Sequence, residues 1–390
     1  MSRIDELIQD LCPSGVEYEA IAELITRSEK VHWDDLDQTD EFRYIDLSTV
    51  DRVTHSINGT ETITKENAPS RAQQVVREGD VLFGTTRPML KRYCIVPADY
   101  DGQVASTGFC VLRANTDRIL TNFLFHLLGT ATFYEYVQTN ERGASYPAIP
   151  DNVVKKFRIP VPPLEVQREI VRVLDKFTQL EAELEAELEA RRAQYQHYLH
   201  SAVLPDGDIE WTTLGEAALN HDRKRKPVTR ADRQGGEYPY YGANGVQDYV
   251  HDYIFDGTFL LVGEDGSVKN ADGTPILNWA SGKIWVNNHA HVLTAAGEHF
   301  NLRYLYYYLA TVDVTIYVTG GTQPKINQSN LNKIPVPLVP RSFQDDIVGV
   351  LDKFDALVND ISVGLPAELN ARRMQYEHYR DRLLTFKEVI

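Results

Sequence analysis

Two long segments of the chain carry apolar residues at steps of three and four on an otherwise charged background. In the first segment these positions include Ile170, Leu174, Phe177, Leu180, Leu184 and Leu188. In the second segment they include Ile347, Leu351, Phe354, Val358, Ile361, Leu365 and Leu369. An apolar stripe on a charged helix is typical of helices that pack as a coiled coil. The contacts between the helices are predicted at Leu174, Phe177, Leu184, Leu188, Leu351, Phe354, Leu365 and Leu369.

The two predicted helices differ in how regular they are. The first contains three tetrads that begin at Leu180, Leu184 and Leu188, and steps of four run ~40° past a full turn, so its stripe drifts. The second is interrupted at Gly364 and Pro366, where proline cannot donate a helical hydrogen bond. We expect a kink there, or a restart with Pro366 in the first turn of a new helix.

The same helical sequence is written twice. The pentapeptide Val-Leu-Asp-Lys-Phe at 173–177 returns at 350–354, and the segment 190–198 resembles 371–379. This period is far longer than the ~20 to 50 residues of a solenoid repeat, so it indicates two duplicated halves. We expect the two helices to pack antiparallel with pseudo-twofold symmetry and the chain ends to lie near each other. The alternative is that each helix packs only on its own domain.

A domain rich in short β-type runs precedes each helix. Prolines punctuate the segments 157–163 and 333–337, which are therefore predicted to be edge strands or extended entries. The predicted class is α+β, with two β-rich mixed domains separated by two long antiparallel helices and duplicated about a pseudo-twofold axis. The expected boundaries are 1–156 and 204–333 for the domains, and 157–203 and 334–390 for the helices.

Composition limits the classes of function. A net charge of −16 argues against a protein whose whole surface binds nucleic acid, so DNA binding must rely on local basic patches. No apolar run approaches the ~20 residues of a membrane span, and the mixed-charge N-terminus is unlike a signal peptide. The odd cysteines Cys12, Cys94 and Cys110 form no metal-type pair, which suits a reducing cytoplasm.

The sequence shows no catalytic constellation. It lacks a phosphate-binding loop, an amino-methyltransferase tetrad and a paired-histidine zinc helix. His289 and His291 could share one strand face, but without a third ligand nearby we interpret them as ordinary strand histidines. The segment 263–270 resembles a calcium loop, yet its charge pattern favours a hairpin turn. No catalytic residue and no metal site are predicted.

Basic and amide side chains gather in predicted loops of both halves. Lys and Arg neutralise phosphates, while Arg, Asn and Gln pair with purine edges in the major groove. The candidates in the first half are Arg87, Lys91, Arg92, Arg142, Ser145 and Tyr146. Those in the second half are Arg223, Lys224, Arg225, Lys226, Arg230, Arg233, Lys269, Asn270, Gln323, Lys325 and Asn327. The alternative for any one of them is a solvated loop charge.

The repeated pentapeptide, the tetrads, the Arg-Arg-x-Gln-Tyr-x-x-Tyr endings and the segment 238–245 together resemble the specificity subunit of type I restriction–modification systems, most closely the type IC group. The resemblance covers essentially the whole chain. It implies two target-recognition domains that each read one half of a split double-stranded DNA site, held apart by helices that set the spacing.

The same resemblance implies a cytoplasmic subunit without catalysis or bound cofactors of its own. Its partners would be two adenine methyltransferase subunits that use S-adenosylmethionine, and motor–nuclease subunits that use ATP and Mg²⁺. Two alternatives from other classes are a structural coiled-coil adaptor with protein-binding domains and a stand-alone enzyme with an unfamiliar site.

Overall fold

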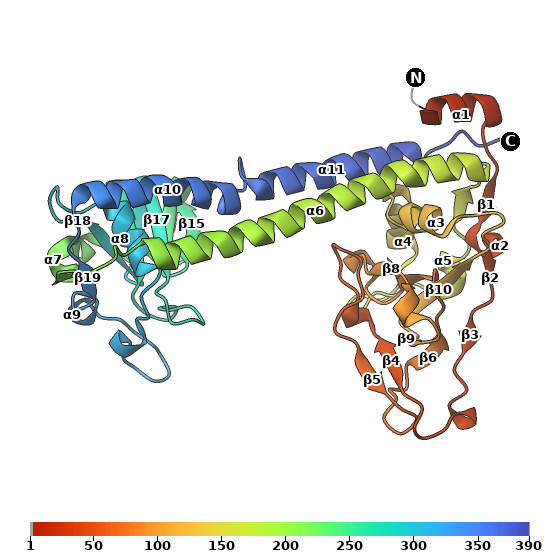
Figure 1. Cartoon of the computed structure of the whole chain (residues 1–390), viewed down its shortest axis with the longest axis horizontal. Helices are drawn as coiled ribbons and strands as arrows, with labels where there is room; N and C mark the ends of the chain where they lie inside the picture. The colour runs from red at the N-terminus through yellow and green to blue at the C-terminus, as the bar shows by residue number, and fades with distance from the viewer. Residues whose placement is uncertain (1–2, 390) are drawn as a thin grey trace. The chain divides into compact units, whose positions relative to one another are not determined.

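A computed structural model describes residues 3–389. The chain forms two compact units. The first unit runs to Glu185 and takes in the chain again from Glu368, and the second runs from Ala186 to Ala367. Each unit combines a β-rich domain with two helical segments that are distant in the sequence (Figure 1). Among the described residues, no helix is both long and apolar enough to cross a membrane.

Three helices account for the two periodic segments. Helix α6 spans the 39 residues Leu164–Ala202, while the second segment forms α10 (Arg341–Asn359) and α11 (Leu365–Leu383). Pro366 is the second residue of α11, where its missing N–H costs no helical bond. The predicted restart is confirmed.

In the first unit, α11 lies beside the N-terminal part of α6 (Figure 1). The ring of Phe177 stacks on Tyr379, with centroids 5.5 Å apart. Four residues further along α6, Glu181 accepts a hydrogen bond of 2.6 Å from Arg373, which lies six residues earlier than Tyr379. Since positions rise along one helix as they fall along the other, the two run antiparallel.

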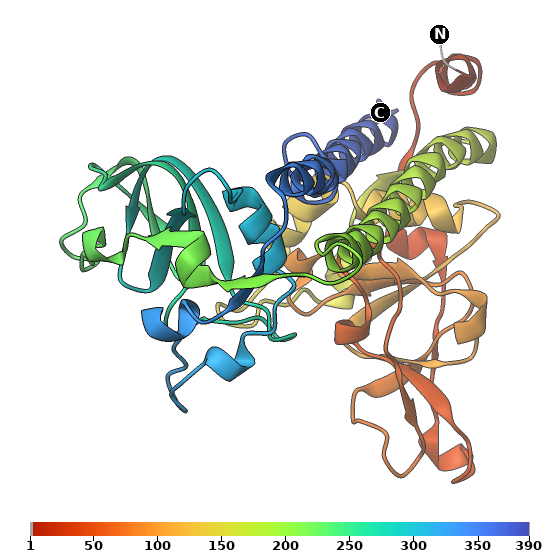
Figure 2. The same cartoon turned by 60° about the vertical axis from the view of Figure 1, so that its left-hand side comes forward.

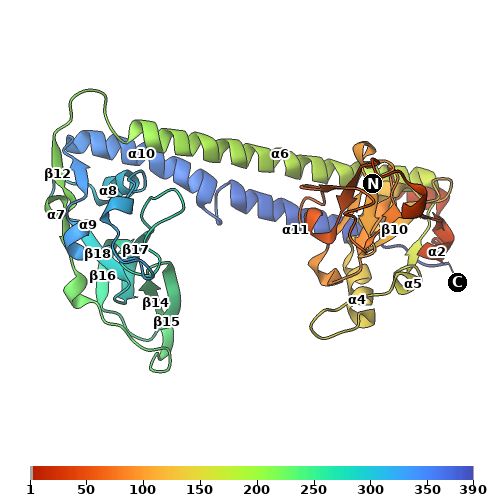
Figure 3. The same cartoon turned by 90° about the horizontal axis from the view of Figure 1, so that it is seen from below.

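In the second unit, α10 runs against the C-terminal part of α6 (Figure 3). Here Tyr198 contacts Phe354, with ring centroids 5.3 Å apart. Helix α6 therefore packs against α11 in the first unit and against α10 in the second. The alternative, in which each predicted helix packs only on its own domain, is wrong.

The predicted helix-pair residues are all at least partly covered. Leu174, Leu188, Leu351 and Leu369 are buried, and Phe177, Leu184, Phe354 and Leu365 are half-buried. Two other positions of the predicted stripes are exposed. Ile361 is 85% exposed because α10 ends two residues before it, and Leu180 is 38% exposed because tetrad spacing turns it off the contact line.

The first unit holds two larger sheets. The four-stranded sheet has the order β2 (Ile25–Thr26), β10 (Phe109–Ala114), β7 (Val81–Gly84), β8 (Tyr93–Ile95). The five-stranded sheet has the order β3 (Glu29–Lys30), β6 (Ala72–Val75), β9 (Val104–Ser106), β4 (Phe42–Ile45), β5 (Glu61–Ile63). Its remaining helices are α1 (Arg3–Leu11), α2 (Ile21–Leu24), α3 (Thr121–Leu128), α4 (Ala131–Asn140) and α5 (Asp151–Val154). The main core joins α3 and α4 to Ile170 and Leu174 of α6.

The larger sheet of the second unit is curved and has six strands, coloured green to cyan in Figure 2. Its order is β13 (Ala218–Asn220), β18 (Ala290–Ala295), β16 (Phe255–Gly263), β17 (Leu277–Val286), β14 (Gly235–Gly242), β15 (Gly245–Val250). The helices of this domain are α7 (Leu214–Ala217), α8 (Leu302–Leu309) and α9 (Gln328–Leu331).

The duplication is also visible in small elements. The proline-punctuated strands β11 (Arg158–Pro160) and β19 (Pro335–Pro337) pair in two-stranded sheets with β1 (Tyr18–Ala20) and β12 (Trp211–Thr213). Both are edge strands, as predicted. Near the chain ends, Val16 donates a 2.8 Å hydrogen bond to the carbonyl of Lys387, which confirms that these terminal segments are adjacent. The predicted α+β class is confirmed.

Candidate nucleic-acid interface

The same short loop is built once in each unit, and we call residues 142–148 and 319–325 the paired loops. Arg142 and Ala148 exchange backbone hydrogen bonds of 2.8 and 2.9 Å, and Thr319 and Lys325 exchange bonds of 2.8 and 2.7 Å. Each loop turns at a glycine with positive φ, +101° at Gly143 and +86° in the second loop. A Cβ on Gly143 would lie 2.9 Å from the carbonyl oxygen of Tyr146, so the turn requires glycine.

Each paired loop is held at the end of a central strand of its sheet. In the first unit, Arg87 follows β7 and donates a backbone hydrogen bond of 2.7 Å to Pro147. In the second unit, Gly266 follows β16 and donates a bond of 3.1 Å to Pro324. A rigid sheet therefore positions both loops, which is how binding loops are commonly presented.

The loop of the first unit presents an aromatic ring beside a cation. Tyr146 is 71% exposed, and the Arg87 guanidinium lies 4.5 Å from its ring centroid. Arg142 and Ser145 are exposed in the same loop. The structure thus brings together Arg87, Arg142, Ser145 and Tyr146 from two sequence clusters. An exposed ring beside these donors can stack on a base and bind a phosphate or a purine edge.

The other two candidates of the first unit lie elsewhere. Arg92 donates through Nη1 to the carbonyls of Leu47 and Val50, the second at 2.8 Å, so it fixes a neighbouring turn. Lys91 is exposed, with its ammonium 5.0 Å from the ring centroid of Tyr134.

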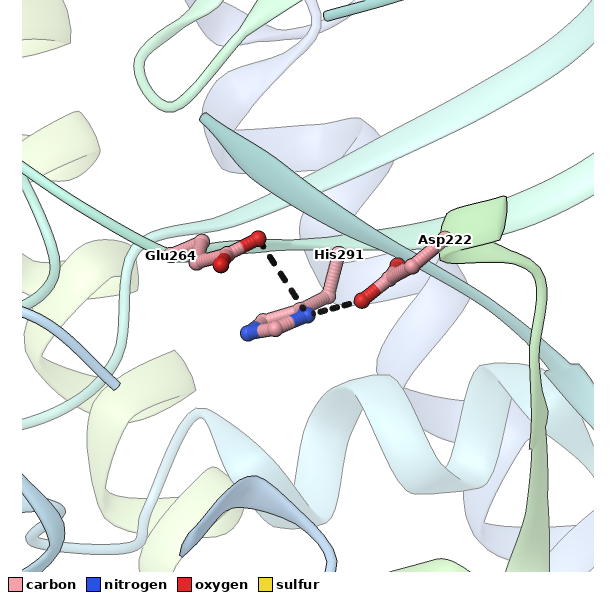
Figure 4. Close-up of side chains that lie close together, drawn as sticks. All are labelled: Asp222, Glu264 and His291. Atoms are coloured by element: carbon pink, nitrogen blue, oxygen red, sulfur yellow. Dashed lines mark hydrogen bonds and ion pairs between the residues drawn. The ribbon is translucent and has the colours of Figure 1, made fainter. Parts of the chain in front are cut away.

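The second unit contains a charge network built around the buried side chains of Glu264 and His291, which Figure 4 shows together with Asp222. His291 Nδ1 lies 2.5 Å from an Asp222 carboxylate oxygen and 3.7 Å from Glu264, while Nε2 lies 2.8 Å from the carbonyl of Ile326. Arg225 pairs with both carboxylates, at 3.2 Å from Asp222. Lys325 Nζ lies 3.0 Å from Glu264.

This network has the donor set of a metal site but supplies its own cations. Ligand atoms of Asp222, Glu264 and His291 lie within 4.8 Å of one another. The positive charges of Arg225 and Lys325 already compensate the two carboxylates, so a metal ion would have to displace them. Burial raises the pKa of Asp222, but the hydrogen bond and charge of His291 and the charge of Arg225 lower it further, to below its ordinary value. The network connects β18 to the end of the second paired loop, at Lys325 and the adjoining Ile326.

The remaining candidates of the second unit fall into two groups. Arg223, Lys224, Lys226, Arg230, Lys269, Asn270 and Gln323 are exposed. Two others are engaged internally: Arg233 pairs with Asp248 at 3.3 Å, and the side chain of Asn327 caps α9 by accepting from Asn330 N–H. Arg225, with a side chain 12% exposed, belongs with this internal group.

The sequence patterns do not single out four polar residues that join each domain to its helix. They are Gln167 and Asp175 in the first unit and Gln344 and Asp352 in the second. The duplication contained the signal, because both pairs recur at the same offset as the pentapeptide.

One protein-family profile matches this chain in two separate places. The profile described as "Type I restriction modification DNA specificity domain" matches residues 24–190 and 208–371, one match for each half. Curated relatives carry specificity-subunit names. A putative type I restriction enzyme specificity subunit of Haemophilus influenzae is 39% identical over 191 residues, 48% of this chain and 49% of its own. The chain thus spans about half the length of this relative.

Two Escherichia coli relatives align over more of the chain. The EcoR124I/EcoR124II specificity subunit is 29% identical over 74% of this chain and 76% of its own length. The EcoprrI specificity subunit is 30% identical over 73% of each. A solved structure described as "Structural basis underlying complex assembly and conformational transition of the type I R-M system" covers 95% of this chain and 98% of its own, with a TM-score of 0.68 and 26% identity.

Proposed function

This chain belongs to the type I restriction–modification DNA specificity family, and we propose that it is the DNA-recognition subunit of such an enzyme. Each domain reads one half of a bipartite site in double-stranded DNA. The observation that carries this proposal is the pair of equivalent loops, built on equivalent strands but carrying different side chains. Two domains that share one scaffold but carry different side chains in their loops suit a DNA site whose halves differ in sequence.

Within this function the domains at 1–156 and 204–333 act as the readers. The helices at 157–203 and 334–390 set the spacing and dock two methyltransferase subunits. The repeated helical motifs favour the type IC group. Chemistry then comes from partners, namely adenine methyltransferases with S-adenosylmethionine and motor–nuclease subunits with ATP and Mg²⁺. The complex acts in the cytoplasm, where its DNA lies.

The proposed DNA contacts are the exposed candidates of each unit. In the first unit they are Arg87, Lys91, Arg142, Ser145 and Tyr146. In the second they are Arg223, Lys224, Lys226, Arg230, Lys269, Asn270 and Gln323. We leave out five residues that are only partly exposed and whose side chains are engaged by internal partners or a helix N-terminus, namely Arg92, Arg225, Arg233, Lys325 and Asn327. Partner subunits supply further basic surface, which offsets the net charge of −16.

The family match disfavours the coiled-coil adaptor, since it covers both β-rich domains as well as helical sequence. The stand-alone enzyme ranks lower still, because the relatives carry specificity-subunit names rather than the name of a catalytic subunit.

The deciding experiment is co-expression of the full chain with the methyltransferase subunits of its host, in a strain without adenine methylation. Single-molecule sequencing should find methylated adenines at one asymmetric bipartite motif, and omission of this chain should abolish them. An adaptor would give no sequence motif in the same assay. Turnover of DNA by the isolated chain would instead indicate an enzyme.

A further inference from the structure

A buried glutamine joins the domain of the first unit to α6. Gln167 is fully buried, and its Oε1 accepts a 2.9 Å hydrogen bond from the backbone N–H of Leu120, just before α3. Its Nε2 donates to the carbonyls of Arg118 and Pro162 at 2.9 and 2.8 Å. One side chain therefore ties the start of α3 to the start of α6.

The second unit repeats this arrangement with a glutamine 177 positions later. Gln344 is also fully buried. Its Oε1 accepts a 2.7 Å bond from the N–H of Asn301, just before α8, and its Nε2 donates to the carbonyls of His299 and Val339 at 3.0 Å each. The start of α8 is thus tied to the start of α10 in the same way.

Two turns further along each long helix, an aspartate makes a second tie to the same domain helix. Asp175 of the repeated pentapeptide accepts from Asn122 Nδ2 at 3.0 Å and lies 2.8 Å from His126 Nε2. The other ring nitrogen of His126 lies 2.8 Å from the hydroxyl of Tyr376 on α11. The first unit therefore links α3, α6 and α11 through one polar chain.

In the second unit the aspartate is the same and the donors differ. Asp352 accepts from Arg303 Nε at 2.7 Å and from the Tyr307 hydroxyl at 2.6 Å. Arg303 and Tyr307 are four residues apart on α8, as Asn122 and His126 are on α3, so each pair faces its long helix together. In both units an aspartate therefore joins the long helix to the domain helix, although the pair of donors differs between the units.

From these contacts we infer that Asp175 and Asp352 are positioning residues for DNA recognition. Each fixes the rotation of a reading domain on its long helix, so that the enzyme accepts one spacing between half-sites. Apolar contacts also hold each domain against its long helix, through Ile170 and Leu174 in the first unit and through Tyr304 and Phe343 in the second. The hydrophobic effect behind such contacts has no preferred direction. The aspartate adds a directional attachment eight residues after the glutamine, and two separated polar attachments define how the domain is rotated on the helix. The inference rests on the proposed function, because spacing has meaning only for a bipartite site.

The exposure of these carboxylates supports a directional role. Side chains of Asp175 and Asp352 are 44% and 46% exposed, so neither fills the core. Exposed ion pairs contribute little to stability, usually below ~1 kcal/mol. Their hydrogen bonds nevertheless specify orientation, since they require the donors to lie at defined angles.

The test uses the complete chain assembled with its methyltransferase subunits. Asp175→Asn and Asp352→Asn are compared with Asp346→Asn, an exposed aspartate of α10. Methylation rates are measured on duplexes that carry the native half-sites at the native spacing and one or two base pairs off it. The wild type should strongly prefer one spacing. Each aspartate variant should lower that preference about tenfold with the half-site bases unchanged, and Asp346→Asn should keep it.

A milder variant covers the case in which an aspartate variant does not assemble. Tyr307→Phe removes one donor to Asp352 but keeps the ring, so it should fold and still widen the accepted spacing. Strict spacing in both Asp175→Asn and Tyr307→Phe would overturn the inference while leaving the proposed function intact. Failure of the proposed function is a separate result, in which the wild-type assembly methylates no bipartite site.

Discussion

Phe177 on α6 stacks on Tyr379 on α11, with ring centroids 5.5 Å apart and ring planes inclined by 24°. The second unit contains the reciprocal contact, in which Phe354 meets Tyr198 at 5.3 Å and 31°. Each contact joins the pentapeptide of one copy to the Arg-Arg-x-Gln-Tyr-x-x-Tyr signature of the other. The two most recognisable repeats of the sequence are therefore the two halves of one helix-pair contact.

The Phe177–Tyr379 pair should show energetic coupling. Aromatic pairs contribute ~0.5 to 1.5 kcal/mol beyond their buried area, so a double-mutant cycle of Phe177→Ala and Tyr379→Ala should give a coupling of about 1 kcal/mol. Urea unfolding followed by circular dichroism measures it. Met374→Ala is the matched control, because Met374 lies on the same helix and is 63% exposed. Strictly additive losses would show that the stacking is incidental.

The paired loops should control one half-site each. Tyr146→Ala should weaken recognition of one half of the DNA motif by tenfold or more, since stacking on a base is worth ~1 to 3 kcal/mol. Gln323→Ala should relax the other half. Methylation mapping of the assembled enzyme distinguishes the two halves.

Gly143 provides an independent test of the same loop. Gly143→Ala should reproduce the Tyr146→Ala phenotype, because its φ of +101° and the nearby Tyr146 carbonyl disfavour a side chain. Val53→Ala changes an exposed residue of the same domain and should leave the motif unchanged. Should Tyr146→Ala and Gly143→Ala both keep the wild-type motif, the loop has no part in reading.

The buried glutamines should be important for stability. Gln167→Ala leaves the N–H of Leu120 and the carbonyls of Arg118 and Pro162 without their partner inside the protein. Each unsatisfied buried group costs ~1 to 3 kcal/mol, so with three such groups the first unit should lose at least about 3 kcal/mol of unfolding free energy. Thermal and urea unfolding measure the loss, and Gln344→Ala should destabilise the second unit similarly.

An exposed glutamine of the same helix separates burial from residue type. Gln179→Ala removes two surface hydrogen bonds, one donated to Glu183 and one accepted from Lys176, so its unfolding free energy should stay within ~0.5 kcal/mol of the wild type. Equal effects of Gln167→Ala and Gln179→Ala would contradict the role given to the buried side chain.

The second unit should lose stability in acid through Asp222. Its pKa in the folded protein lies below the ordinary value, as burial is outweighed by the hydrogen bond and charge of His291. A lowered folded pKa means that the unfolded chain binds the proton first. The stabilisation is therefore complete above the unfolded pKa of ~3.9 and is lost as pH falls through the folded pKa.

Urea unfolding of the wild type and two variants between pH 7 and pH 3 tests this dependence. Asp222→Asn should be less stable at pH 7 and should show a shallower fall below pH 4. Asp208→Asn, at an exposed position of the same unit, should follow the wild-type curve. A wild-type curve that stays flat down to pH 3 would contradict the assignment.

Periodicity and duplication predicted the fold well because both depend on local spacing. The stripe located α6, α10 and α11, and Pro366 marked the start of α11 as expected. The same argument was wrong at Leu180 and, most clearly, at Ile361, both of which are exposed. A three- and four-residue pattern continues through Ile361, but the chain has already left the helix after Asn359, so the side chain points to solvent.

The candidate site was less predictable because charge alone does not reveal where a side chain finds its partner. Arg225 stands in a basic run with Arg223 and Lys224, yet it pairs with Glu264, 39 residues away. Arg92 similarly binds the carbonyl of Val50, 42 residues earlier. Such partners meet only after the sheet has formed, so composition cannot separate internal ion pairs from free donors.

The leucine tetrads of α6 should act as a ruler for the spacing between half-sites. One tetrad adds ~6 Å at 1.5 Å per residue, against 3.4 Å per base step, so insertion or deletion should shift the spacing by about one or two base pairs. The tetrad from Leu184 is suitable, because it lies within the 39-residue helix. The partner helices can accommodate the change, since the chain between Asn359 and Leu365 is not helical and Ile361 there is 85% exposed.

Methylation mapping should show unchanged half-sites at a new spacing. A four-residue insertion at the exposed Gly59 turn is the control and should leave the spacing unaltered. New half-site bases, or an unaltered spacing in the tetrad variants, would rule out the ruler.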